Sequence, residues 1–125
     1  GPFLITFMKT IHPVPCYAMR FVEEKTGKVF VYTGDSGYLE SFIDFAENAD
    51  VFLADTYLFE GNEQHHAHFT SKESGEIAKA AHVKTLVLTH LPQHGSLEEL
   101  KEQAQKAAGD QVEVCLAEKN LVITI

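Results

Sequence analysis

Short runs in which apolar residues alternate with polar ones dominate the first third of the chain, and this period of two is typical of β-strands. Three such runs predict strands, at residues 3–8, 16–22 and 28–33. The second and third are joined by the turn Glu24-Lys25-Thr26-Gly27. Shorter and denser apolar runs predict four further strands, at residues 51–54, 85–88, 112–116 and 121–125. Asp50 precedes the run at 51–54 and Asp55 follows it.

Helical signals lie between these runs. Residues 39–47 have a partly apolar face and predict a short helix. Thr70 and Glu73 have the spacing of a capping box and predict a helix that runs to residue 81. Ser96 and Glu99 repeat that spacing and predict a last helix, which ends near Gly109. The polar, histidine-rich stretch 60–70 predicts a loop.

This order of elements predicts an α/β (α+β) fold in one domain, residues 1–125, built on a mixed sheet with helices covering mainly one face. A sheet with a single helical layer leaves its other face without a partner. We therefore expect that face to pack against a missing half of the protein or against a second copy of the chain in a homo-oligomer.

Composition narrows the class of protein. The 125 residues are 45% hydrophobic and 22% charged, which is ordinary for a soluble domain. No apolar run reaches the roughly 18 to 20 residues of a membrane span. The net charge of −8 argues against broad binding to a phosphate backbone, although bound divalent cations would reverse the local field. Cys16 and Cys115 lie in apolar runs without metal-binding spacing, so we expect buried free thiols and a cytoplasmic protein rather than a disulfide or a metal site.

Three side chains of the kind that bind zinc or manganese stand at the ends of apolar runs: His12, Asp35 and His90. Asp35 lies in Thr-Gly-Asp-Ser-Gly, where the flanking glycines allow a sharp turn. His90 follows the run at 85–88, at the strand end where ligands gather in open α/β sheets. Each residue alone also fits a structural role, as a turn aspartate or a hydrogen-bonded histidine.

A histidine cluster in the polar loop, made of His65, His66 and His68, is a further candidate. Such a tract can bind metal, but in a polar loop it is more often solvated. His68 stands just before the capped helix, where it could be held in place and act as a general acid or base near neutral pH.

Four segments in this order resemble the metallo-β-lactamase superfamily, and within it the ribonuclease Z-like metal-dependent hydrolases. They are His-Pro-Val-Pro-Cys-Tyr-Ala-Met-Arg-Phe (12–21), Tyr-Thr-Gly-Asp-Ser-Gly (32–37), His-Phe-Thr-Ser-Lys-Glu-Ser-Gly-Glu-Ile-Ala (68–78) and Leu-Thr-His-Leu (88–91). Each segment alone is weak evidence, but the ordered set spans nearly the whole chain. The resemblance implies the C-terminal half of the family's αββα sandwich.

The resemblance also implies roles for particular residues. His12 would bind one of two divalent metal ions, zinc first or else manganese, His90 would bind the other, and Asp35 would bridge both. A hydroxide activated by the two ions would attack a phosphodiester or ester. His68 would stabilise or protonate the leaving group. Asp35 and His68 are thus the expected catalytic residues, and His12, Asp35 and His90 the expected metal ligands.

Two departures from the family pattern matter. The His-x-His-x-Asp-His motif, which supplies most of the remaining ligands, is absent, so the metal site is incomplete and we expect the chain alone to be inactive. The chain begins Gly1-Pro2, either a tag remnant or native sequence entered midway, and we expect it to be a piece of a longer protein.

The second departure is the short turn before residue 28, where transfer-RNA-processing members commonly carry a long substrate-binding arm. With the acidic charge, this favours a phosphodiesterase that acts on a small phosphodiester or ester. A transfer-RNA 3′-processing endonuclease of the ribonuclease Z type, acting on RNA, is the alternative. A non-catalytic binding module, in which these residues are structural, is the alternative of another class.

Overall fold

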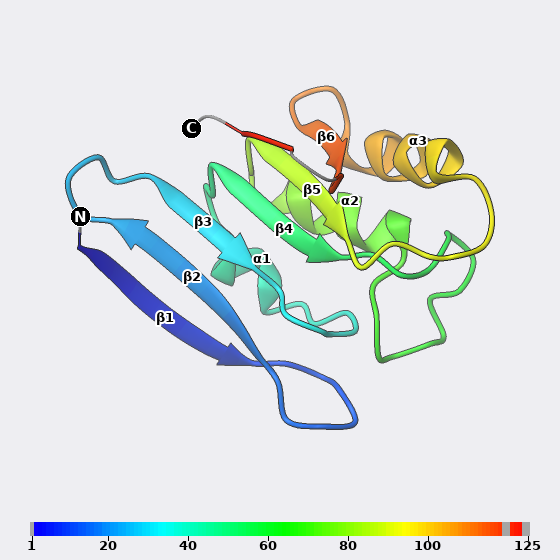
Figure 1. Ribbon diagram of the computed structural model, residues 1–125, viewed down its shortest axis with the longest axis horizontal. Coiled ribbons are helices and arrows are strands. Elements are labelled where there is room, and N and C mark those ends of the chain that lie inside the picture. Colours follow the sequence, from blue (N-terminus) through cyan, green and yellow to red (C-terminus); the bar gives the residue numbers. More distant parts are fainter. Residues whose placement is uncertain (1, 119–120, 124–125) are drawn as a thin grey trace.

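Six strands form one sheet in which each strand lies beside its neighbour in the sequence, in the order β1-β2-β3-β4-β5-β6 (Figure 1). The computed structural model describes residues 2–118 and 121–123. The strands are β1 (Phe3–Lys9), β2 (Tyr17–Glu23), β3 (Val29–Tyr32), β4 (Val51–Asp55), β5 (Thr85–Thr89) and β6 (Glu113–Leu116). The helices are α1 (Phe42–Phe45), α2 (Ser71–Ala80) and α3 (Leu97–Ala108).

The sheet is mixed, as the sequence predicts. β1 pairs with β2 and β2 with β3 in antiparallel fashion, whereas β3, β4, β5 and β6 are parallel. Two reversals of direction make β1 run the same way as β3. The carboxyl ends of β1, β3, β4 and β5 therefore lie at the same edge of the sheet.

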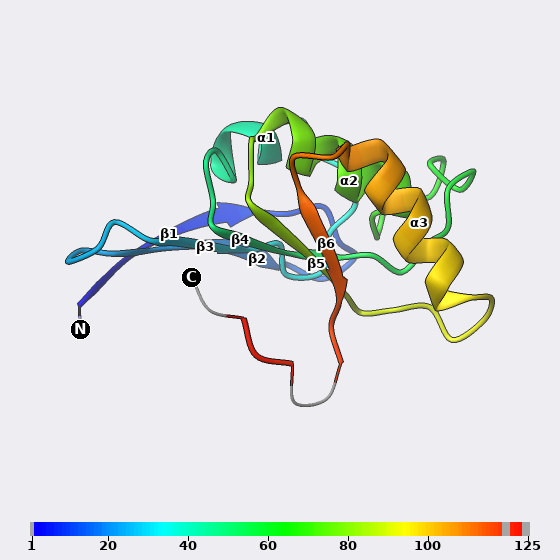
Figure 2. The same ribbon diagram turned by 90° about the horizontal axis from the view of Figure 1, so that it is seen from above.

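All three helices cover one face of the sheet (Figure 2). Their apolar side chains and those of the sheet form the core, whose largest fully buried members are Phe42, Phe52, Phe69, Ile77, Leu86, Leu88 and Leu100. α2 and α3 approach closely at Gly75, where an added Cβ would lie only 2.4 Å from the carbonyl oxygen of Ala104. The predicted mixed sheet with one helical layer is confirmed.

The predicted helix starts and stops are largely confirmed. Thr70 and Glu73 form a complete capping box at the start of α2. Ser96 accepts a hydrogen bond from the N–H of Glu99, and the chain leaves α3 at Gly109 with φ of 82°. The helix predicted at 39–47 is much shorter, because turns flank α1 and Asn48, at φ of 57°, redirects the chain.

The other face of the sheet is apolar and open at its β1 side. Phe3, Ile5 and Phe7 point away from the helices and are 55%, 43% and 61% exposed. No strand forms at 121–123, so the prediction of a strand at 121–125 is wrong for these residues, and residues 124–125 lie outside the described part. Leu121 and Ile123 instead line a hollow on this face with Phe30, Leu53 and Val87.

No helix in the described part of the chain is long and apolar enough to cross a membrane. Cys16 and Cys115 are free thiols, both partly buried.

Asp50 ties the starts of three strands together. Its Oδ2 accepts a hydrogen bond from the N–H of Val29 at 2.9 Å, and its Oδ1 lies 3.1 Å from Nζ of Lys84 and 3.9 Å from Nζ of Lys28. Burial raises the pKa of Asp50, but the Val29 N–H and the two ammonium groups outweigh it and hold this pKa below its usual value.

Replacing this carboxylate, Asp50→Asn, is expected to lower the free energy of unfolding by about 1–2 kcal/mol at neutral pH. Because the folded pKa is depressed, the contribution is complete above the unfolded value of about 3.9 and is lost as the pH falls through the folded pKa. Urea titrations between neutral and acidic pH measure this difference, with the exposed Asp110→Asn as control. A deficit that stays constant down to acidic pH would contradict the assignment.

Candidate metal centre

Strand direction brings together four side chains that are far apart in the sequence. His12 follows β1, Asp35 follows β3, Asp55 is the last residue of β4, and His90 follows β5. Because these strands point the same way, their ends deliver the four side chains to one edge of the sheet. His68, which precedes α2, joins them from the loop above. All four residues singled out from the sequence thus meet here, and Asp55 is an addition.

Asp35 lies between His12 and His90. Its Oδ2 is 4.0 Å from Nε2 of His12, and its Oδ1 is 3.6 Å from Nδ1 of His90. Each carboxylate oxygen therefore faces a different imidazole. Ligand atoms on one tetrahedral zinc ion lie about 3.3 Å apart, given bonds of about 2.0–2.1 Å. The spacing of these three residues is only slightly wider than that.

The turn that carries Asp35 is fastened to the loop that carries His12. The hydroxyl of Thr10 donates to the carbonyl oxygen of Asp35 at 2.9 Å, and the N–H of Gly37 donates to the carbonyl oxygen of Ile11 at 3.1 Å. Gly34 adopts φ of 63°, and a Cβ there would lie 2.7 Å from the carbonyl oxygen of Tyr17. Glycine is required because the backbone bends sharply against β2.

Gly37 brings the histidine loop onto the same turn. A Cβ at this position would lie 1.8 Å from the carbonyl oxygen of His66, so only glycine allows this contact. His65 and His66 themselves are exposed. The loop thus delivers His68 to the centre, while its two other histidines face solvent.

Asp55 is the buried anchor of the cluster. Its side chain is 1% exposed, and its backbone N–H donates to the hydroxyl of Thr33 at 2.9 Å. Its Oδ2 accepts from the N–H of Ser36 at 3.2 Å and lies 2.8 Å from Nδ1 of His68, a hydrogen-bond distance. Its Oδ1 lies 3.2 Å from Nδ1 of His90. One carboxylate thereby holds both imidazoles.

The electrostatics of Asp55 suit a cationic partner. Burial raises the pKa of this carboxyl group, and the contacts with His68 and His90 act against that rise. Its Oδ1 is buried and accepts no hydrogen bond within the described residues, which is costly for a carboxylate. Ligand-type atoms of Asp55, His68 and His90 also lie within 4.8 Å of one another. These donors and the uncompensated oxygen fit a divalent cation bound at this edge.

The sequence did contain a signal for Asp55. It follows a buried apolar run just as Asp35 and His90 do, but the pattern around it indicates only the end of a strand. An acidic residue at that position is also a common way to end a strand, so the pattern alone did not separate the two roles.

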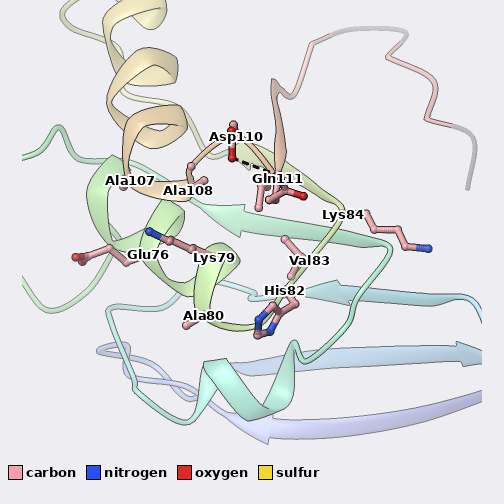
Figure 3. A pocket seen from close by; sticks show the side chains of 12 residues that line it. Glu76, Lys79, Ala80, His82, Val83, Lys84, Ala107, Ala108, Asp110 and Gln111 are labelled. Atoms are coloured by element: carbon pink, nitrogen blue, oxygen red, sulfur yellow. Dashed lines mark hydrogen bonds between the residues drawn. The ribbon is translucent and has the colours of Figure 1, made fainter.

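A large hollow lies elsewhere in the described part of the protein. It has a volume of about 830 Å³ and opens between the C-terminal ends of α2 and α3, where Lys79, His82 and Asp110 surround it (Figure 3). Its residues precede β5 and β6, so it lies at the opposite edge of the sheet. No group of three metal-ligating side chains occurs there within residues 2–118 and 121–123.

Comparison with known proteins identifies the family. A family model described as a β-lactamase superfamily domain matches residues 5–91. The metallo-β-lactamase fold protein YhfI from Bacillus subtilis has a crystal structure that superposes with a TM-score of 0.88 at 41% identity, over 97% of this chain and 49% of that one. The chain belongs to the metallo-β-lactamase superfamily. The resemblance inferred from the four segments is confirmed.

Curated relatives of this superfamily member include the probable metallo-hydrolase YhfI of Bacillus subtilis, 42% identical over 91% of this chain and 46% of the relative. The ribonuclease Z of Haloarcula marismortui is 35% identical over 78% of this chain and 32% of the relative. The structure of the short form of human tRNase Z has a TM-score of 0.73 at 26% identity, over 98% of this chain and 43% of that one. The chain thus spans less than half the length of these proteins.

The contact between Gly37 and the histidine loop can be tested by Gly37→Ala. The added methyl group must displace the backbone of His66, so we expect a loss of about 1–3 kcal/mol in the free energy of unfolding. We also expect the Nδ1–H signal of His68 in the proton NMR spectrum to weaken, because the hydrogen bond to Asp55 loosens.

Gly27→Ala is the control, since nothing lies within 4 Å of a Cβ there. Alanine is strained at the φ of 73° found here, so this variant lowers the free energy of unfolding, but it does not change the site. An unchanged His68 signal in Gly37→Ala would show that the loop does not depend on this contact.

Proposed function

We propose that this chain carries part of the active site of a metal-dependent hydrolase that cleaves phosphodiesters, with His12, Asp35 and His90 as metal ligands and His68 as the general acid. The observation that carries the proposal is the position of Asp35, whose two oxygens face His12 and His90 separately. A carboxylate in that position is suited to bridge two cations. Imidazole nitrogen and carboxylate oxygen are donors that zinc and manganese both accept.

His68 is the best placed proton donor. Its Nδ1 lies 2.8 Å from Oδ2 of Asp55, and an ionised carboxylate can only accept, so Nδ1 carries a proton. That leaves Nε2 to face the reacting atoms, and the proton that His68 would give to the leaving oxygen is the one that Nε2 carries in the doubly protonated imidazolium form. The 2.8 Å distance is also shorter than the spacing of two ligands on one ion, which favours a positioning role for Asp55 over joint metal binding with His68.

The charges of the chain bear on the substrate. Bound divalent cations would lower the pKa of an attacking water and offset the negative charge of a phosphodiester. Without them, Asp35 and Asp55 would repel an anionic substrate, as would the net charge of −8. His68 then has the task of donating a proton to the leaving oxygen, which general acids accelerate by about 10²–10⁴-fold.

The ligand set in this chain is incomplete. With Asp35 bridging, His12 and His90 leave each cation with two protein ligands, fewer than the three that catalytic zinc sites usually draw from the protein. We infer that the chain is the C-terminal half of a longer hydrolase and that an N-terminal half supplies the other ligands. The open apolar face around Phe3, Ile5 and Phe7 supports such a partner, with a second copy of the chain as the alternative.

We place the protein in the cytoplasm, because the free thiols Cys16 and Cys115 are typical of a reducing compartment. The substrate is then an intracellular phosphodiester or ester.

A ribonuclease Z activity on precursor transfer RNA is the second candidate, favoured by the ribonuclease Z of Haloarcula marismortui among the relatives. The tight turn between β2 and β3, where the N–H of Gly27 donates to the carbonyl oxygen of Glu23, carries no extended arm for RNA.

Two substrates separate these candidates when both are offered to the full-length protein. Cleavage of bis(p-nitrophenyl) phosphate without cleavage of precursor transfer RNA supports the first candidate. Removal of the 3′ trailer supports the second, and a full-length protein that stays metal-free after zinc or manganese supplementation supports a non-catalytic module.

The 125-residue chain alone is expected to show no turnover of bis(p-nitrophenyl) phosphate when zinc or manganese is added, because its ligand set cannot hold the ions tightly. The full-length protein is expected to turn the substrate over. A His90→Ala variant of the 125-residue chain is the matched blank for contaminating activity. Turnover by the unmodified chain above that blank would falsify the incomplete-site proposal.

In the full-length protein, His90→Ala and His68→Ala are expected to fail in different ways. His90→Ala should lower the metal content, measured by mass spectrometry, because a ligand is lost. His68→Ala should keep its metal and lower kcat by about 10²–10⁴-fold, because a general acid is lost.

The exposed His65→Ala, in the same loop as His68, is the control and should change neither quantity. If His68→Ala lost metal as His90→Ala does, then His68 would be a ligand and its assignment as the acid would be wrong.

A further inference from the structure

Tyr57 packs against both imidazoles that Asp55 holds. Its ring centroid lies 5.1 Å from that of His68 and 5.2 Å from that of His90, with interplanar angles of 54° and 36°. The two imidazoles lie 4.9 Å apart and nearly perpendicular, at 85°. The three rings therefore form a compact cluster at the carboxyl ends of β4 and β5.

The backbone around Tyr57 is fixed to the neighbours of both histidines. The N–H of Thr56 donates to the carbonyl oxygen of Thr89, the residue before His90, at 2.8 Å. The N–H of Leu58 donates to the carbonyl oxygen of Phe69, the residue after His68, at 3.3 Å. Hydrogen bonds on either side of Tyr57 therefore fix its backbone, and with it the Cα that carries the ring, relative to both histidine segments.

Asp55 alone does not define the planes of the two imidazoles. The hydrogen bond between Nδ1 of His68 and Oδ2 of Asp55 fixes one atom of that ring but leaves the ring free to pivot, and His90 lies beside Oδ1 of Asp55 without a hydrogen bond to it. His90 is most at risk, because its side chain is 46% exposed and its Nδ1 lies 3.2 Å from the carboxylate, a longer contact than the one to His68. A flat aromatic neighbour removes that freedom, since edge and offset contacts between rings favour particular orientations.

We propose that Tyr57 is a positioning residue whose aromatic ring, and not its hydroxyl group, holds His68 and His90 in the planes that set their Nδ1 atoms against Asp55. Asp55 and Tyr57 stand two residues apart on one segment, so this segment contacts each imidazole through a carboxylate oxygen and through an aromatic ring. The inference rests on the proposed function only in naming His68 as the acid and His90 as a ligand; the ring contacts stand without it.

The test uses the metal-free 125-residue chain labelled with nitrogen-15. Long-range proton–nitrogen spectra recorded at alkaline pH report which ring nitrogen of each neutral histidine carries the proton. A held tautomer gives two widely separated nitrogen shifts, whereas a ring that exchanges tautomers gives two averaged shifts. Nitrogen shifts report the proton position and are far less sensitive to the loss of a neighbouring ring current.

In the unmodified chain and in Tyr57→Phe, His68 and His90 are expected to show separated shifts with the proton on Nδ1. In Tyr57→Leu and Tyr57→Met, which keep an apolar side chain without a ring, the separation should be lost for His90 and reduced for His68. Tyr17→Leu, at a 53% exposed tyrosine, is the matched control and should leave both histidines unchanged.

Each other outcome overturns the inference. Separated shifts in Tyr57→Leu or Tyr57→Met would show that the imidazoles are held without an aromatic ring. Averaged shifts in Tyr57→Phe would assign the effect to the hydroxyl group. If one aliphatic variant fails to fold, as seen in its amide spectrum, the other decides, and if both unfold while Tyr57→Phe folds, the ring serves stability and the positioning role is overturned. Because no turnover or metal is measured, a protein with no hydrolase activity could still confirm the ring contacts.

Discussion

The buried carboxylate of Asp55 is the interaction on which the rest of the site depends, because it is charged, almost inaccessible to water and in contact with both imidazoles at the centre. A carboxylate in such a place must be compensated, and here the N–H of Ser36 and Nδ1 of His68 serve Oδ2 while Nδ1 of His90 lies closest to Oδ1. The same contacts dictate which nitrogen of each imidazole remains available. Burial of one charge therefore organises the orientation of two neighbouring side chains.

The sheet places the side chains that surround Asp55 at one edge. Its parallel strands deliver Asp35, Asp55 and His90 to one edge, and the reversal through β2 returns β1 so that His12 reaches the same edge. Close backbone contacts at Gly34 and Gly37 then press the connecting loops together. These contacts leave no room for a Cβ, so the geometry of the centre follows from backbone packing as much as from the ligating side chains themselves.

Much of the fold could be predicted from periodicity and capping. The six strands lie within one residue of their predicted bounds, and the capping box at Thr70 and Glu73 forms as expected. The failures have physical causes. The helix at 39–47 is cut short where turns and the left-handed Asn48 redirect the chain, and residues 121–123 do not pair as a strand, although Leu121 and Ile123 line a hollow on the sheet. The local sequence pattern does not show where the rest of the fold overrides a predicted helix or strand.

The sequence by itself determined the class of elements, because strand periodicity is a local property of the chain, and its ordered motifs determined the superfamily and through it the expectation that His12, Asp35, His68 and His90 share one centre. Only the tertiary structure decided that Asp55 is buried against two imidazoles and that Tyr57 packs against both of them. Those facts depend on the distance between the ends of β4 and β5 and on the loop that returns His68 to them. An aspartate at the end of a strand looks the same in sequence whether it faces water or two histidines, and the difference arises when the strands pair and the loops close over them.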